Sequence, residues 1–128
     1  MRRRRFLQLG TAGLIAASLP GAAISVASQS ELHRLAEPGL LHILRDRESV
    51  RAIGASYRRT VPFEDDVHVL AAQITGDMKR SGGSAANQAD IEKQVRRDFD
   101  RGRTVQIDGW VLSRTEARQC ALFSLIAG

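Results

Sequence analysis

The sequence predicts a mainly α fold: a small bundle of about five helices, with one two-stranded β-hairpin at residues 104–113 directly before a C-terminal helix. Three observations lead to this prediction. Apolar residues recur three and four positions apart through most of residues 39–101. Asp108-Gly109 is a two-residue turn between two segments rich in apolar residues. Ser113 precedes Glu116 by three residues, which is the capping-box spacing at a helix start.

Residues 1–27 are predicted to be a cleaved export signal outside this fold. Four arginines follow Met1, and an uncharged run extends from Phe6 to Ser30. The small residues at 25–27 fit a cleavage site that follows Ala27. A Sec signal and an uncleaved membrane anchor are the alternatives, although Pro20-Gly21 interrupts the roughly 20-residue apolar helix that an anchor needs.

The type of signal is indicated by Arg3-Arg4, which are followed by Phe6 and Leu7. This order resembles the twin-arginine (Tat) export signal. Gln8 stands where that family often has Lys, and Arg2 stands where it often has Ser or Thr. The resemblance implies transient contact with the Tat translocase, a periplasmic or exported location, and membrane contact only through the signal segment if that segment stays uncleaved.

The first half of the expected domain, which spans 38–128, contains three helices. Residues 28–37 before it are predicted to be a linker or one helical turn. A short helix opens at Pro38-Gly39 and is expected to end near Asp46. The next helix, over 47–60, has an apolar stripe made of Val50, Ile53, Gly54 and Tyr57. Because glycine destabilises a helix by about 1 kcal/mol relative to alanine, Gly54 indicates the close approach of another helix.

The third helix is expected to begin after Glu64-Asp65-Asp66, which offers a cap and negative charge at its N-terminus. Its predicted stripe is Val67, Leu70, Ala71 and Ile74, and its predicted end is Gly76. Residues 77–88 contain Gly82-Gly83 and several small polar residues, so we expect a flexible loop there.

A fourth helix is predicted from residue 88 or 90 to residue 101, with Gly102 as its stop. Its apolar stripe is predicted to be Ile91, Val95 and Phe99. Glu92 and Arg96 stand four positions apart in the order that favours an ion pair.

The hairpin should place Val105, Ile107, Trp110 and Leu112 on one face. That face must pack on helices, because an isolated two-stranded hairpin is marginally stable in water. The final helix is apolar around most of its circumference, so it is expected either to lie at the centre of the fold or to contact a partner. The candidate partner surface is Trp110, Leu122, Phe123 and Ile126, although core packing is the other explanation for Trp110.

The overall charge does not indicate a nucleic-acid partner. The chain has 19 basic and 14 acidic residues, but four of the basic residues are Arg2–Arg5 of the signal. The remainder is close to neutral, so a polyanion is not expected to bind it.

No catalytic, cofactor-binding or metal-binding residue is predicted. His33, His42 and His68 lack the spacing of metal ligands, and no HExxH, Cys-x-x-Cys or Gly-rich phosphate loop is present in the sequence. The acidic residues before His68 are better explained as a helix start than as a cation site. Cys120, the single cysteine, rules out an intramolecular disulfide and is expected to be a buried, inert thiol.

Two groups of residues resemble known sequences. The first is Ile53-Gly54-x-x-Tyr57 with Pro62-x-Glu64; the second is Asp98-Phe99-x-x-Gly102 with Asp108-Gly109-Trp110-Val111-Leu112-Ser113-x-Thr115-Glu116-Ala117-Arg118. With the signal, they resemble a group of small, mostly uncharacterised bacterial exported proteins with Tat signals. In size, signal and helical character the chain is also similar to the small Tat-signal subunits of membrane-bound sugar and alcohol dehydrogenases.

The second resemblance implies a cofactor-free subunit that accompanies a flavin-containing large subunit through export. We therefore expect an exported, non-catalytic accessory or escort subunit with a larger, oxidoreductase-type partner. A stand-alone periplasmic binding or envelope-structural domain is the alternative. A small hydrolase or redox enzyme using Cys120 or His68 is a third hypothesis.

Overall fold

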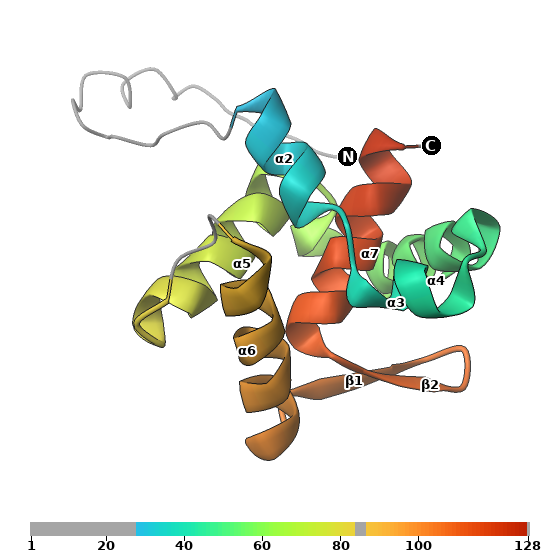
Figure 1. Ribbon diagram of the computed structural model, residues 1–128. Helices are drawn as coiled ribbons and strands as arrows, with labels where there is room; N and C mark the ends of the chain where they lie inside the picture. Colours follow the sequence, from blue (N-terminus) through green and yellow to red (C-terminus); the bar gives the residue numbers. More distant parts are fainter. Residues whose placement is uncertain (1–27, 84–86, 128) are drawn as a thin grey trace.

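The structure is a computed structural model that describes residues 28–83 and 87–127. Over these residues it contains six α-helices, one 3₁₀ turn and one two-stranded antiparallel hairpin (Figure 1). In chain order the elements are α2 (Gln29–Leu35), α3 (Gly39–Leu44), α4 (Arg47–Thr60), η2 (Pro62–Glu64), α5 (Val67–Arg80), α6 (Gln88–Asp100), β1 (Thr104–Ile107), β2 (Trp110–Ser113) and α7 (Arg114–Ile126). The predicted mainly helical fold, with a hairpin before the C-terminal helix, is confirmed.

Helix α7 lies at the centre of the fold. It contacts α2, α4, α5, α6 and both strands, and these elements surround it in Figure 1. Its residues Ala117, Cys120, Ala121 and Leu122 are fully buried. Of the two roles expected for this apolar helix, central burial is therefore the one observed.

The most extensive helix contact is between α4 and α7, and it depends on Gly54. A Cβ atom added to Gly54 would lie 2.0 Å from the carbonyl oxygen of Cys120 and 2.8 Å from the backbone nitrogen of Ala121. The close approach predicted from this glycine is confirmed.

Side chains cap the helix N-termini where the sequence indicated. Asp66 accepts hydrogen bonds from the N–H groups of His68 and Val69, and Ser113 accepts one from Glu116 at 2.9 Å. Each cap satisfies backbone donors that have no partner within the helix. The segment expected to be a linker or one helical turn forms α2, which buries Leu32 and Leu35 in the core.

The predicted end of the third helix was wrong. Helix α5 continues through Gly76 to Arg80, so residues 77–80 of the expected loop are helical. Two side chains beyond Gly76 explain the continuation, because Asp77 is 5% exposed and ion-paired and Met78 is 1% exposed in the core. The stabilisation from these tertiary contacts outweighs the weak helix propensity of glycine.

The predicted apolar stripe of α6 was wrong in part. Ile91 is buried, but Phe99 is 46% exposed, and the buried face continues instead through Gln94 and Asp98. The carboxylate of Asp98 can be buried because it accepts hydrogen bonds from the amide of Gln94 and from the backbone N–H of Thr115 outside α6.

The hairpin has the predicted register, in which Ile107 pairs with Trp110 and Val105 with Leu112. Asp108 and Gly109 have φ values of 51° and 87°, as a primed two-residue turn requires. On the inner face Ile107 and Leu112 are buried, whereas Trp110 is 39% exposed. On the outer face Val111 is exposed.

Candidate functional site

A buried charged cluster connects α7 with α4, η2 and α5, and its centre is Arg118. The guanidinium of Arg118 donates to both carboxylate oxygens of Glu64, at 3.0 Å each, and to Asp77 Oδ2 at 2.9 Å. The hydroxyl of Tyr57 donates to Glu64 Oε1 at 2.8 Å. Arg118, Glu64 and Asp77 are each at most 6% exposed, so the charges are compensated by one another rather than by water.

A third acidic residue, Asp98, continues this cluster towards the start of α7. Arg103 donates to Asp77 Oδ2 at 2.6 Å and lies 3.5 Å from Asp98 Oδ1. Arg80 also forms an ion pair with Asp77. The fully buried Asp98 accepts from Gln94 at 3.0 Å and from the backbone N–H of Thr115 at 2.9 Å. Asp98 and Ser113 thus cap the same helix together.

Two members of this cluster, Glu64 and Tyr57, keep one protonation state near neutral pH. Burial would raise the pKa of Glu64, but hydrogen bonds from Arg118 and Tyr57 outweigh it and hold that pKa below its ordinary value. Burial and the hydrogen bond to Glu64 raise the pKa of Tyr57 to about 12. The cluster is therefore suited to fixing helices relative to one another, and not to moving protons near neutrality.

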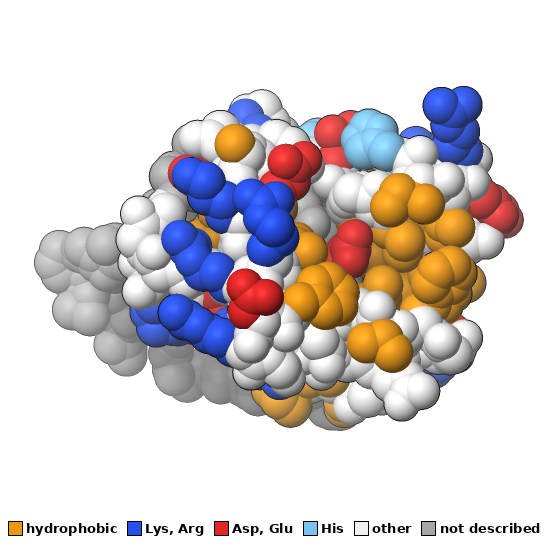
Figure 2. All heavy atoms as spheres, turned by 60° about the horizontal axis from the view of Figure 1, so that its bottom comes forward, with side chains coloured by type: hydrophobic (Ala, Val, Ile, Leu, Met, Phe, Trp, Pro, Cys, Tyr) orange, Lys and Arg blue, Asp and Glu red, His pale blue; other side chains and the backbone are white. Residues whose placement is uncertain are grey.

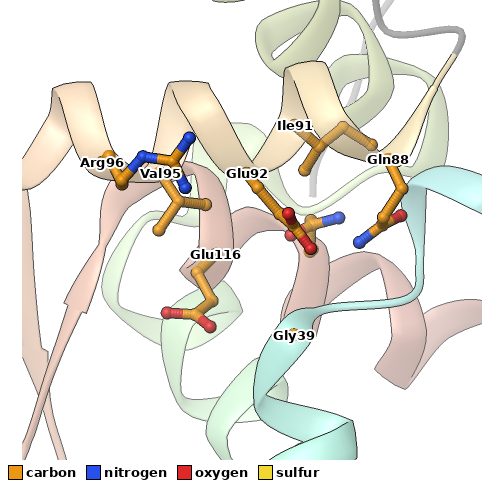
Figure 3. Close-up of a pocket in the computed structure, with 8 residues that line it drawn as sticks. Gly39, Gln88, Ile91, Glu92, Val95, Arg96 and Glu116 are labelled. Atoms are coloured by element: carbon orange, nitrogen blue, oxygen red, sulfur yellow. The ribbon is translucent and has the colours of Figure 1, made fainter.

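A pocket of about 170 Å³ opens between α6, α7 and the turn that leads into α3. Figure 3 shows Gln88, Ile91, Glu92 and Val95 projecting from α6 towards Glu116 of α7 and Gly39. Arg96 of α6 and Gln119 of α7 complete the lining. The expected pair of Glu92 and Arg96 is not present among the ion pairs of residues 28–83 and 87–127, and both side chains line the pocket instead.

Two polar side chains of α7, Glu116 and Gln119, line this pocket with few hydrogen-bond partners. Burial raises the pKa of Glu116, and the N–H of Leu40 opposes this by donating a hydrogen bond. Gln119 is 1% exposed; its amide nitrogen donates to the carbonyl of Leu35 at 3.0 Å. Its Oε1 atom is buried and accepts no hydrogen bond from the described residues.

The four residues of the candidate partner surface differ in their exposure to solvent. Leu122 is fully buried, Phe123 is 4% exposed, and Ile126 is partly buried against the core. Arg47 covers the ring of Phe123 at 4.9 Å from its centroid. Trp110 remains accessible, with Val111 beside it in the chain. Figure 2 shows the lower face of the molecule, where hydrophobic side chains gather in the centre and on the right and Lys and Arg side chains line the left.

Cys120 and the three histidines do not form a common site. Cys120 is fully buried, and burial followed by the nearby charge of Glu116 raises the pKa of its thiol far above the ordinary value. His33, His42 and His68 are exposed. Within residues 28–83 and 87–127 no group of three or more His, Cys, Asp or Glu side chains could hold a metal ion.

The expected signal, with Arg3, Arg4, Phe6 and Leu7, lies outside the described residues. Among the helices that are described, none has the length and apolar character needed to cross a membrane.

The buried cluster and the pocket were not predicted from the sequence. The available signal was Arg118 on a largely apolar helix, because a buried arginine needs buried acidic partners.

Comparisons of the chain with protein-family models, with curated proteins and with solved structures find no match.

Proposed function

We propose that this chain is an exported, non-catalytic accessory subunit that travels through the Tat pathway with a larger, oxidoreductase-type partner. The order Arg3-Arg4-x-Phe6-Leu7 supports the choice of pathway. A folded domain suits Tat, which transports folded proteins. The central α7, with its capped N-terminus and the ion pairs of Arg118, gives this small domain internal contacts that favour folding before export.

The observation that carries the partner proposal is the accessible end of the hairpin. Trp110 is 39% and Val111 58% exposed, on a two-stranded sheet whose outer edges pair with no further strand among the described residues. Tryptophan is enriched at the energetic centres of protein interfaces, and sheet edges can pair with a partner's strand. Leu122 and Phe123 are buried, so they do not belong to this accessible surface.

Co-purification tests the proposal. The tagged chain, isolated from the periplasm of its own organism, should recover a stoichiometric larger protein. The Trp110→Ser and Val111→Ser variants should lose that protein. Phe63→Ser is the matched control, because Phe63 is 78% exposed in η2 and outside the hairpin. A folded monomer that recovers nothing, or equal recovery by all the variants, contradicts the partner proposal.

Export is tested separately. Replacing Arg3 and Arg4 with lysine should retain the chain in the cytoplasm, whereas replacing Arg2 and Arg5 should not. Normal export of the Arg3→Lys, Arg4→Lys variant would favour the Sec alternative.

The stand-alone binding domain is the second candidate function, and the pocket beside Glu116 favours it. It predicts a stable monomer with a sharp thermal transition and a small ligand in this pocket.

A further inference from the structure

We propose that the pocket between α6, α7 and the turn before α3 binds a small organic cation: an amidinium or primary ammonium group on a benzene-sized apolar body. This inference deepens the binding-domain candidate. It does not depend on a larger partner.

The charge of the lining favours a cation. Glu92 and Glu116 supply two carboxylates, whereas Arg96 is the one basic side chain among the residues that line the pocket. The carboxylate of Glu116 is half-buried and receives one backbone N–H, from Leu40. Its remaining lone pairs can accept further hydrogen bonds from a bound donor. A cationic donor would stabilise this half-buried carboxylate further.

Gln119 independently indicates a hydrogen-bond donor. Its amide nitrogen is held on the α2 side by the carbonyl of Leu35, so the oxygen is the end of the amide left for the pocket. A buried carbonyl oxygen without a partner is destabilising, and only a hydrogen-bond donor relieves this. An ammonium or amidinium group has several N–H donors. It can therefore satisfy Gln119 and Glu116 together, whereas an anion can satisfy neither.

The size and the walls define the rest of the ligand. A buried apolar cavity of about 150 Å³ accommodates benzene, and this pocket has a volume of about 170 Å³. Ile91 and Val95 form its apolar wall. Gly39 lies on the opposite wall, where a Cβ atom would be in ordinary van der Waals contact with Glu116 Oε2 at 3.8 Å.

Calorimetric titration of the purified full-length chain tests the inference, with benzamidine and benzylamine as probes. The matched control ligands are benzoate, which is negatively charged, and benzyl alcohol, which is uncharged. We expect saturable binding of the two cations and at least about tenfold weaker binding of benzoate and benzyl alcohol, since a hydrogen bond to a charged group contributes about 1.5–3 kcal/mol.

Three variants locate the site. Glu116→Gln should weaken benzamidine binding about tenfold or more, and Val95→Phe should abolish it by filling the pocket. Glu48→Gln is the control, because Glu48 is an exposed carboxylate of α4. Thermal unfolding of each variant shows whether it folds, and Val95→Phe leaves every polar group of the pocket in place.

Three results would overturn the inference: no saturable binding of either cation at millimolar concentration, equal binding of benzoate, or binding that neither Glu116→Gln nor Val95→Phe changes. None of these results bears on co-purification of a larger protein, so failure here is distinguishable from failure of the escort proposal.

Discussion

Gly54 of α4 lies directly against the carbonyl group of Cys120 in α7. A methyl group at position 54 would approach that oxygen to 2.0 Å and the attached carbon to 2.5 Å. Backbone atoms in the middle of a buried helix cannot move aside as the end of a flexible side chain can. The separation of the two central helices is therefore set by the absence of a side chain at Gly54.

Gly54→Ala should destabilise the domain by about 3 kcal/mol or more, at or above the upper end of overpacking effects, because α4 and α7 must separate. Urea unfolding followed by circular dichroism measures the change. Gly76→Ala in α5 is the matched control. A Cβ there meets only the guanidinium of Arg80 at 3.6 Å, so we expect a gain of about 0.5–1 kcal/mol from helix propensity. Equal effects of the two substitutions would contradict the close-packing argument.

The features that the sequence predicted are those decided by neighbouring residues. The Asp108-Gly109 turn fixes the hairpin register, and the spacing of Ser113 and Glu116 fixes the start of α7. Gly54 indicated a close helix contact because its position in an apolar stripe has no local explanation.

The features that it did not predict depend on partners far apart in the chain. Glu64 looked like part of a helix start, but its carboxylate binds Arg118, 54 residues later. Asp98 likewise depends on a distant partner. Its buried oxygen accepts a hydrogen bond from the backbone N–H of Thr115, which follows the hairpin. Periodicity assigns polar residues to the surface, and therefore it placed Phe99 inside α6's buried face and Asp98 outside it. The pocket likewise needs three elements whose packing no local pattern specifies.

Arg118→Met should cost about 3–5 kcal/mol of folding free energy, because it leaves Glu64 and Asp77 buried without their shared cation. Chemical denaturation provides the measurement. Glu48→Gln removes one member of an exposed ion pair and should change stability by less than about 0.5 kcal/mol. A loss of similar size in both variants would show that the cluster is no more important than a surface pair.

Acid should weaken the fold partly through Glu64. Its pKa in the folded state lies below the ordinary value, so the native state binds this proton more weakly than the unfolded state does. The resulting stability is fully present above the ordinary carboxyl pKa and is lost as the pH falls through the lower, folded value. Glu64→Gln should be less stable than the parent at neutral pH, and its stability should fall less on acidification. A pH dependence identical to that of the parent would contradict this assignment.

Alkali should act through Tyr57, the only tyrosine of the chain, so tyrosinate absorbance reports on this residue directly. Its folded pKa of about 12 lies above the ordinary value of 10.0. The corresponding stability is present below the ordinary value and is lost as the pH rises through the folded one. Native protein should therefore ionise Tyr57 later than urea-unfolded protein. In Glu64→Gln the tyrosine should ionise at lower pH than in the parent, because the buried negative charge that accepts its hydrogen bond is gone.

Cys120 should react with thiol reagents only when α4 and α7 separate. The side chain is fully buried, and its raised pKa keeps it in the thiol form, which is a poor nucleophile. Iodoacetamide labelling followed by mass spectrometry should therefore be slow in the native protein and fast in urea. Gly54→Ala should speed native labelling in proportion to its loss of stability, because opening of this helix pair exposes the sulfur, whereas Gly76→Ala should not. Rapid labelling of the parent protein would show that the thiol is accessible, and would revive the hypothesis of a reactive Cys120.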